Sequence, residues 1–382
     1  MFKLVVDENI SYAAEAFSKF GQVKLMHGRK IDRQALSDAD ALIIRSITNV
    51  NEELLKGTPV KFVGTATIGT DHIDKGYLRE NGIAFSSAKG CNADAVAEYV
   101  YSAMFHIMGK KGLTLKDKTL GVVGIGNIGS RVVRLGKVLG LNVLENDPPL
   151  ERKTKEKGFV ELKEVLSADI ITFHVPLNLG GEDNTYHLLD KEKLSLIKKD
   201  AILINASRGP VIDNEALLEL KKKNDYISVA LDVWEKEPGF DQRLLKTIEI
   251  GTPHIAGYSL EGKVNGTEMI FKALSSYLKS GLSFNPELPI VPDQQITLKA
   301  NASKESILNK AFSYAYEISQ DDVQMRKALE MTEEEKAKYF DLLRKDYKLR
   351  REFSNYLIRL EPFSQDTGDI LRAFRFKLNQ TN

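Results

Sequence analysis

A glycine-rich segment constrains the fold of this 382-residue chain more than any other part of its sequence. The segment reads GVVGIGNIG and places Gly124, Gly126 and Gly129 in the spacing G-x-G-x-x-G. Glycines are common in turns, so this spacing alone is a weak signal. Here, however, the segment follows an apolar run of strand character and opens a stretch whose apolar residues recur at helical spacing. A strand, a glycine loop and a helix in this order are typical of a site that binds the pyrophosphate of a dinucleotide.

The residues of this loop have separate expected roles. Gly124 permits the tight turn, Gly126 lets the backbone approach the pyrophosphate, and Gly129 allows close helix–strand packing. Asn127 and Ile128 lie where the helix begins, and the free N–H groups of a helix N-terminus attract phosphates. A packing turn that binds no ligand is the alternative.

Asp147 follows the next expected strand. A carboxylate at this position accepts hydrogen bonds from ribose hydroxyls and repels a 2′-phosphate, so the sequence predicts NAD as the cofactor rather than NADP. Arg152 lies close enough in the sequence to leave NADP open as an alternative.

Short β-branched runs alternate with helical patterns on both sides of the glycine loop, which indicates parallel sheets with crossover helices. The expected strands are Lys3–Val6, Ala41–Ile44, Lys61–Gly64, Ile83–Phe85, Leu120–Val123, Asn142–Leu144, Asp169–Phe173, Ala201–Ile204, Ile227–Leu231 and Glu249–Ile250. The pattern predicts an α/β protein with two doubly wound, Rossmann-like or flavodoxin-like domains. We place a substrate-binding domain at residues 1–92, completed by 258–284, and an NAD-binding domain at residues 93–257.

The remaining segment, residues 285–382, differs in composition. Between Asp321 and Glu352 it holds nine acidic and nine basic residues, with an apolar stripe at helical spacing. Thr332 followed by Glu335 is a capping box that predicts a helix start. We expect a small α+β dimerisation domain here, with a solvated flap as the alternative.

Composition excludes several classes of protein. The 54 basic and 53 acidic residues give a net charge of +1, which argues against binding to nucleic acid or an anionic membrane. The single cysteine, Cys91, allows no intrachain disulfide and no cysteine cluster for a metal. The first residues carry Asp7 and Glu8 where a signal peptide requires an apolar run, so we expect a cytoplasmic protein without a metal site.

Three residues near the ends of late strands are candidates for catalysis: Arg208, Glu237 and His254. Oxidation of an alcohol by hydride transfer needs a base for the hydroxyl proton, a cation for the substrate carboxylate and a group that tunes the base. Ligands of open α/β sheets bind beyond the carboxyl ends of the strands, so these residues are expected to converge.

The segments that carry these residues, NASRG at 205–209, DVWEKEP at 232–238 and GTPHIAG at 251–257, resemble the D-2-hydroxyacid dehydrogenase family. The resemblance implies that Arg208 grips the substrate carboxylate, that His254 is the acid/base, and that Glu237 pairs with His254. A surface ion pair or a satisfied loop histidine is the alternative for each residue taken alone.

The resemblance also implies further ligand contacts. Ser46, Thr67 and Tyr258 are carried over as substrate contacts, and Arg45 is our own addition as a phosphate partner, with a structural salt bridge as its alternative. Expected contacts to NAD come from Val175 (often Thr in relatives), Ala206, Ser207, Arg208, Asp232 and Gly257. Asp232 has a turn-stabilising alternative, and we expect His174 to be structural.

The resemblance extends over the whole chain and implies a small phosphorylated 2-hydroxy acid as substrate and a homodimer formed through residues 285–382. Two alternatives stay open at this point. One is a sister dehydrogenase acting on 3-phosphoglycerate, glycerate or glyoxylate, and the other is an NAD-sensing binding protein without catalytic activity.

Overall fold

The computed structural model describes residues 1–223 and 226–378. Contacts divide them into two compact units, of which the first comprises Met1–Asn92 with Ser259–Ile290 and the second Ala93–Tyr258 with Val291–Asn382. In the described part of the chain, no helix combines the length and the apolar character that crossing a membrane requires.

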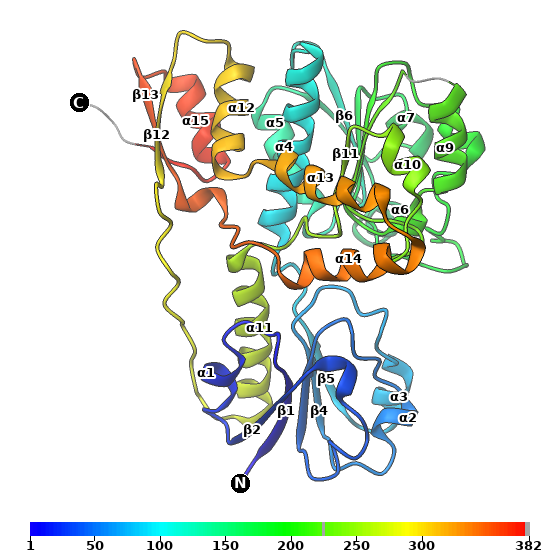
Figure 1. Cartoon of the computed structure of the whole chain (residues 1–382), viewed down its shortest axis with the longest axis vertical. Coiled ribbons are helices and arrows are strands. Elements are labelled where there is room, and N and C mark those ends of the chain that lie inside the picture. Colours follow the sequence, from blue (N-terminus) through cyan, green and yellow to red (C-terminus); the bar gives the residue numbers. More distant parts are fainter. Residues whose placement is uncertain (224–225, 379–382) are drawn as a thin grey trace. The chain divides into compact units, whose positions relative to one another are not determined.

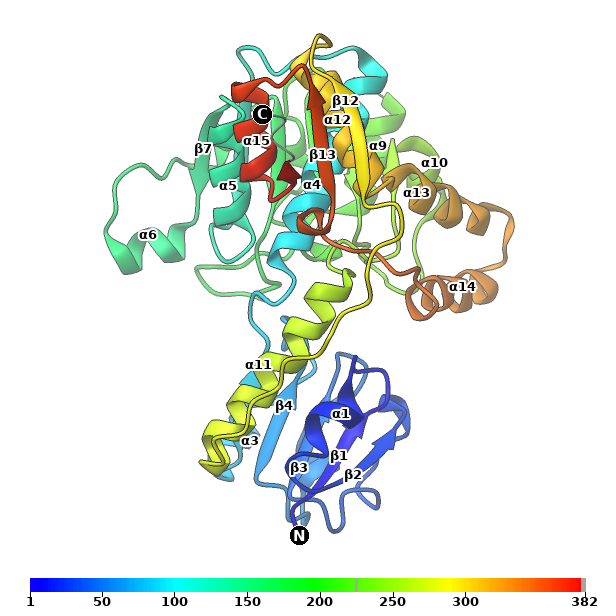
Figure 2. The ribbon, with the colours of Figure 1, turned by 90° about the vertical axis from the view of Figure 1, so that its left-hand side faces the viewer.

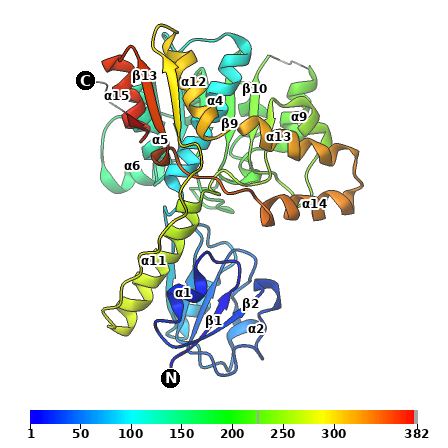
Figure 3. The ribbon, with the colours of Figure 1, turned by 60° about the vertical axis from the view of Figure 1, so that its left-hand side comes forward.

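The first unit contains a five-stranded parallel sheet in the order β2-β1-β3-β4-β5, which is the flavodoxin-like order. Its strands are β1 (Lys3–Asp7), β2 (Gln22–Met26), β3 (Ala41–Ile44), β4 (Phe62–Thr65) and β5 (Ala84–Ser87), and its helices are α1 (Ala13–Phe17), α2 (Glu52–Leu55), α3 (Lys75–Glu80) and α11 (Leu260–Leu278). Alternate strand residues point to opposite faces, so α1 and α11 cover one core and α2 and α3 the other (Figure 3).

Four of these strands confirm the sequence prediction, and β2 is the one that it missed. The residues of β2 are mostly exposed or half-buried, as expected of a strand at the edge of a sheet. Because an edge strand buries little apolar surface, Gln22–Met26 lacks the apolar run that marks the strands within the sheet.

The second unit contains a six-stranded parallel sheet in the order β11-β10-β9-β8-β6-β7. Its strands are β6 (Thr119–Val123), β7 (Asn142–Asn146), β8 (Ile170–Phe173), β9 (Ile202–Asn205), β10 (Ser228–Leu231) and β11 (Ile250–Gly251). The helices α4 (Ala93–Lys111) and α5 (Gly129–Val138) cover one face, and α7 (Leu162–Val165), α8 (Lys191–Leu194), α9 (Asn214–Lys223) and α10 (Gln242–Thr247) cover the other; α6 is Pro148–Thr154 (Figure 1). The chain order reverses between β6 and β8, where ligands of such sheets bind.

The C-terminal part of the second unit adds a three-stranded parallel sheet, β12-β13-β14. Its elements are β12 (Gln295–Lys299), α12 (Lys304–Ala315), α13 (Ile318–Arg326), α14 (Glu333–Lys345), β13 (Leu357–Glu361), α15 (Gln365–Ala373) and β14 (Lys377–Leu378) (Figure 2). Short 3-10 turns lie at Gly28–Lys30, Gly209–Val211, Lys327–Glu330 and Phe353–Asn355. We expected an α+β arrangement, and because its strands are all parallel, α/β describes this part more closely. The predicted capping box of Thr332 and Glu335 is confirmed at the start of α14.

One aromatic core explains why the C-terminal part belongs to the same compact unit as the six-stranded sheet. Phe105 of α4 packs edge-on against Phe312 of α12 at 5.0 Å between ring centroids. Phe312 also stacks on Phe353, and Tyr101 contacts Phe374 edge-on. Helix α4 is therefore buried between the large sheet on one side and the C-terminal part on the other.

Candidate active site

The glycine loop joins the end of β6 to the start of α5. Gly124 has a φ of +87°, and a Cβ there would lie 2.7 Å from the carbonyl oxygen of His174. A Cβ on Gly129 would lie 1.9 Å from the carbonyl oxygen of Gly124, whereas a Cβ on Gly126 would meet no atom within 4 Å. The turn and the close packing are thus present at Gly124 and Gly129, and the backbone of Gly126 is open to an approaching phosphate.

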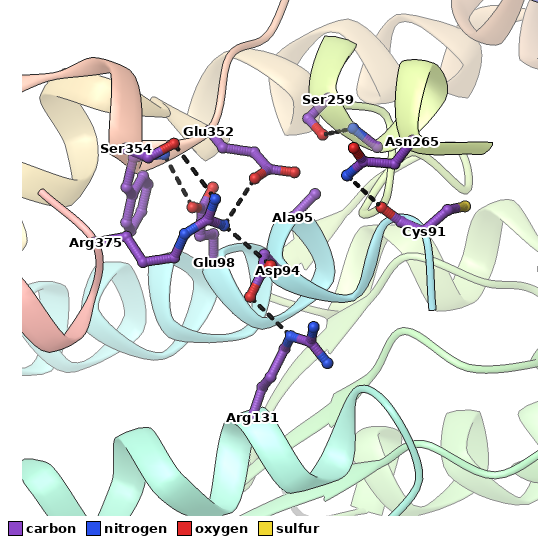
Figure 4. A network of polar contacts seen from close by, with 12 residues as sticks. Cys91, Asp94, Ala95, Glu98, Arg131, Ser259, Asn265, Glu352, Ser354 and Arg375 are labelled. Atoms are coloured by element: carbon purple, nitrogen blue, oxygen red, sulfur yellow. Dashed lines mark hydrogen bonds and ion pairs between the residues drawn. The ribbon is translucent and has the colours of Figure 1, made fainter. Parts of the chain in front are cut away.

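Helix α5, which follows this loop, takes part in a network of ion pairs (Figure 4). Arg131 of α5 donates to the carbonyl oxygen of Asn127 at 2.7 Å and to Asp94 at 2.7 Å. Asp94 also pairs with Arg375 at 3.1 Å, which in turn pairs with Glu352 at 2.8 Å. The C-terminal part is therefore linked to the cofactor loop through Asp94 and Arg131, two residues to which the sequence assigned no role.

The Asp147 carboxylate is engaged by the backbone on both oxygens. It accepts from the N–H of Ile125 in the glycine loop at 2.7 Å and from the N–H of Leu150, in the first turn of α6, at 3.0 Å. A carboxylate oxygen accepts more than one hydrogen bond, so contact with ribose hydroxyls remains available. Arg152, which left NADP open, pairs with Glu182 and Asp183 at 3.2 and 2.5 Å.

The three predicted catalytic residues follow strand ends that lie side by side. Asn205 of β9 is paired with Leu231 of β10, and Leu231 is paired with Gly251 of β11. Each candidate lies on the segment directly after one of these residues. A Cβ on Gly209 would lie 2.0 Å from the Trp234 carbonyl, so the loop of Arg208 and that of Glu237 touch through their backbones.

His254 and Glu237 form a direct pair, with Nδ1 of the imidazole 2.7 Å from Oε2 of the carboxylate. The other carboxylate oxygen accepts from the N–H of Trp234 at 2.8 Å. The His254 side chain is 34% exposed and the Glu237 side chain is 21% exposed. The imidazole is therefore accessible to solvent, and the carboxylate lies deeper in the protein. His254 adopts a left-handed φ of +59° and donates its backbone N–H to the carbonyl oxygen of Asp232.

The electrostatics of the pair keep the carboxylate ionised. Burial alone would raise the pKa of Glu237, but His254, the Trp234 N–H and Arg344 together lower it below its ordinary value of 4.5. A charged carboxylate beside Nδ1 orients the imidazole and stabilises the imidazolium that forms when His254 takes a proton.

This lowered pKa predicts a pH-dependent stability. The Glu237 carboxylate stabilises the fold above pH 4.5, and its contribution is lost as the pH falls through the lower pKa of the folded state. We expect wild type to be more stable than Glu237→Gln at neutral pH, with the difference in Tm shrinking as the medium is acidified below that value. Thermal unfolding followed by circular dichroism checks this, and a difference independent of pH would contradict it.

Asp232 organises the loop that carries His254. Its carboxylate accepts from the Thr252 hydroxyl at 2.6 Å and from the N–H groups of Ile255 and Ala256 at 2.8 and 2.9 Å. Burial raises its pKa. These contacts are those of a turn-stabilising residue, the alternative in the sequence interpretation, and a contact with the nicotinamide stays a prediction.

The Arg208 loop is held by Asn205, a residue that the sequence interpretation passed over. The Asn205 carboxamide accepts from the N–H and hydroxyl of Ser207 at 3.0 and 2.8 Å and donates to the carbonyl oxygen of Arg208 at 3.0 Å. The Arg208 guanidinium donates to the Ser207 carbonyl oxygen at 2.8 Å. Ala206 lies between these anchored residues, and Gly257 follows the loop that Asp232 organises.

The segment after β8 borders the glycine loop. A Cβ on Gly124 would lie 2.8 Å from Cγ1 of Val175. The surroundings of His174 fit a structural role. Its Nε2 contacts the Thr172 hydroxyl at 3.1 Å, and burial lowers the pKa of the imidazole to about 3. The ring is therefore neutral at physiological pH.

The predicted substrate contacts Arg45, Ser46 and Thr67 belong to the first unit. Strand β3 is paired with β4 at Ile44 and Thr65, so the segments that carry these residues start beside each other. The Thr67 hydroxyl lies 2.7 Å from the Thr65 hydroxyl and donates to the Gly69 carbonyl oxygen.

Lys263 of α11 is a further cation that sequence reasoning did not select. Burial, and then repulsion from Arg45, lower its pKa. Two cations that repel each other on one unit are suited to a multiply charged anion. Among the ion pairs of the described residues, none includes Arg45, which argues against the structural salt bridge.

Tyr258 contacts the C-terminal part of the second unit. Its ring lies edge-on to that of Tyr347 at 5.9 Å between centroids. The guanidinium carbon of Arg344 is 5.8 Å from the centroid of the Tyr258 ring.

One cluster has the residue types of a metal site: His187, Asp213 and Glu235. The two ring nitrogens of His187 face different carboxylates: Nε2 lies 2.7 Å from Glu235, and Nδ1 lies 3.7 Å from Asp213. In the structure this histidine thus lies between two carboxylates, one at hydrogen-bond distance and one further away.

Comparison with known proteins agrees with this geometry. The family model described as "D-isomer specific 2-hydroxyacid dehydrogenase, NAD binding domain" matches residues 94–256, and a domain of unknown function (DUF3410) matches residues 288–372. Among solved structures, D-lactate dehydrogenase from Aquifex aeolicus complexed with NAD and lactic acid has a TM-score of 0.59 at 27% identity, covering 73% of this chain and 96% of that one. An acyclic imino acid reductase in complex with NADPH and D-Arg has a TM-score of 0.62 at 26% identity, covering 73% and 98%.

A curated relative extends the likeness to the C-terminal part. The erythronate-4-phosphate dehydrogenase of Salmonella arizonae is 45% identical over 365 residues, which is 95% of this chain and 95% of that protein. The predicted fold class and NAD as the predicted cofactor are thereby confirmed. The chain belongs to the erythronate-4-phosphate dehydrogenases, within the D-2-hydroxyacid dehydrogenase family.

Proposed function

We propose that this chain is an NAD-dependent dehydrogenase that oxidises the 2-hydroxyl of 4-phosphoerythronate to 3-hydroxy-2-oxo-4-phosphooxybutanoate, on the route to pyridoxal 5′-phosphate. The identity of the substrate rests on the 45% identity that extends over 95% of the chain, the C-terminal part included. The observation that carries the chemistry is the 2.7 Å contact between His254 and Glu237 at the strand ends of the NAD-binding unit.

The proposed roles follow from the charges of the three residues. Arg208 binds the substrate carboxylate, because a guanidinium matches the geometry of a carboxylate. His254 accepts the proton of the 2-hydroxyl while C2 loses a hydride, and Glu237 balances the charge of the imidazolium. When bound, NAD supplies the acceptor for this hydride. In the reverse direction His254 returns the proton to the carbonyl oxygen.

Residues of the second unit fit NAD as the cofactor. The open backbone at Gly126 and the start of α5 suit a pyrophosphate, and Asp147 suits ribose hydroxyls. Arg152 is occupied by two carboxylates and therefore offers little to a 2′-phosphate.

The phosphate of the substrate is assigned to Arg45 and Lys263, with Ser46 and Thr67 as neighbouring hydroxyl contacts. We expect Arg45→Ala and Lys263→Ala each to raise KM for the phosphosubstrate roughly tenfold or more, because hydrogen bonds to charged groups contribute about 1.5–3 kcal/mol. Both variants should change kcat less than KM. Steady-state kinetics measure this, with Arg79→Ala on the exposed surface of α3 as the control. An unaltered KM in both variants would remove the assignment.

The function is tested by NADH formation with a panel of 2-hydroxy acids. We expect the highest kcat/KM with 4-phosphoerythronate, and higher activity with NAD than with NADP. Preference for 3-phosphoglycerate, glycerate or glyoxylate would identify a sister enzyme. NADH binding without turnover on any member of the panel would instead favour the NAD-sensing protein.

We also propose that the chain forms a homodimer through its C-terminal part, as expected from the sequence. Large apolar side chains exposed there support this, namely Val323, Leu342 and Leu349 at 57%, 48% and 61% exposure. Sedimentation velocity should give twice the 42.8 kDa of one chain, and replacement of these three residues by serine should shift it to the monomer. The cytoplasmic location stays a prediction.

A further inference from the structure

Helix α14 of the C-terminal part is anchored on the segment that carries Glu237. Phe340 of α14 is fully buried in the same core as Trp234 and Phe240, which flank Glu237 in the sequence. The Phe240 and Phe340 ring centroids are 6.0 Å apart, and the ammonium of Lys336 lies 3.3 Å from the Phe240 carbonyl oxygen. These contacts fix helix α14 on the segment that carries Glu237.

Arg344, in the last turn of α14, is the side chain that reaches toward this pair. Its guanidinium carbon lies 5.8 Å from the centroid of the Tyr258 ring and 5.9 Å from that of Phe340. Its Nε is buried and makes no hydrogen bond with the described residues. Arg344 thus places a half-buried cation over the ring of Tyr258, a predicted substrate contact.

The electrostatics connect Arg344 to Glu237 as well as to Tyr258. Burial alone would lower the pKa of Arg344, but Tyr258 and Glu237 raise it above its ordinary value. Arg344 in turn helps to lower the pKa of Glu237. The Glu237 carboxylate is therefore influenced by the charge of Arg344, in addition to its hydrogen bonds with His254 and the Trp234 N–H.

A permanent cation beside Glu237 has a chemical consequence. A guanidinium stays charged at all physiological pH values. It opposes a further positive charge on the His254–Glu237 pair. It also fixes Tyr258 through its ring face, which a side chain without charge would do less well.

We propose that Arg344 is a positioning residue for the dehydrogenase, through which the C-terminal part of the chain holds the Glu237 carboxylate and the Tyr258 ring around His254. This inference rests on the proposed function. A cation that merely attaches α14 by packing is the competing interpretation, and it predicts a change in stability alone.

The test uses the full-length chain with Arg344→Gln, Arg344→Lys and the control Lys345→Gln. Lys345 is the next residue of the same helix and is exposed, so the control removes the same charge from the solvent side. We expect Arg344→Gln to lower kcat roughly tenfold and to move the acidic limb of the kcat/KM profile to higher pH. Arg344→Lys should restore the position of the limb but only part of kcat, because the fork geometry is lost. Lys345→Gln should match wild type.

Two readouts separate positioning from packing and from failure of the proposed function. NMR titration of the His254 ring needs no turnover, and its midpoint should move to higher pH in Arg344→Gln but not in Lys345→Gln. A wild-type pH profile and a wild-type ring titration in Arg344→Gln, with only Tm lowered, would overturn the inference. If wild type oxidises no hydroxy acid, the proposed function fails, while the ring titration still decides whether Arg344 acts on the pair.

Discussion

Replacement of His254 by asparagine is expected to lower kcat for oxidation by about 10²–10⁴-fold, the range that general acid–base catalysis supplies. The His254 imidazole lies 2.7 Å from the half-buried Glu237 carboxylate and is 34% exposed, so solvent and substrate can reach it. Asparagine is preferred to alanine because the residue has a φ of +59°, which asparagine tolerates better. Affinity for NADH, measured by fluorescence, should stay close to that of wild type.

The chain offers a matched control in His187. This histidine also has a positive φ, of +47°, and also contacts a glutamate at 2.7 Å, through Nε2 to Glu235. His187→Asn should keep kcat within about twofold of wild type, because its two ring nitrogens face carboxylates rather than a site open to substrate. If His254→Asn retained turnover, or if both variants lost it equally, His254 would not be the acid/base.

The second large effect is expected from two alanine substitutions in the glycine loop. One should lower the affinity for NAD, and the other should lower the stability of the fold. Gly126→Ala places its Cβ in open space, so the fold should be unaffected while NAD affinity falls by tenfold or more, because the methyl group occupies the approach of the pyrophosphate. Gly129→Ala places its Cβ 1.9 Å from the Gly124 carbonyl oxygen, and overpacking of this kind costs about 1–3 kcal/mol or more of folding free energy.

Each of these variants is the control for the other. Urea unfolding measures the loss of stability, and titration with NADH measures the loss of affinity. A Gly126→Ala chain with wild-type affinity would show that the pyrophosphate does not approach at this position. A Gly129→Ala chain with wild-type stability would show that the turn can relax away from the contact.

Much of the fold was predictable because it depends on local patterns. Runs such as Ala41–Ile44 and Ala201–Ile204 are strands buried within a parallel sheet, and burial on both faces makes them continuously apolar. The strand β2 was not predicted, because its position at the edge of the sheet leaves it largely exposed and without an apolar run. The capping box at Thr332 was predictable since its two partners are three residues apart.

The main residues of the candidate site could be predicted from the sequence, whereas the residues that hold them in place were harder to predict. Arg208, Glu237 and His254 stand on segments whose order resembles a known family, and the register of β9, β10 and β11 brings these segments together. Among the supporting residues, Asn205 acts over two or three positions, whereas Arg344 lies more than a hundred residues from Glu237 in the sequence. The packing of Phe340 and Lys336 against Phe240 brings its helix to the segment that carries Glu237.

The amino-acid order by itself determined the two parallel sheets, the glycine loop and the choice of candidate catalytic residues, because periodicity, glycine spacing and residue type act over a few neighbouring positions. Only the tertiary structure decided that Asp232 holds the His254 loop by hydrogen bonds, that the charges of Lys263 and Arg45 repel each other within one unit, and that α14 packs on the segment that carries Glu237. These contacts depend on the meeting of distant side chains in a common core, and no short stretch of sequence encodes such a meeting.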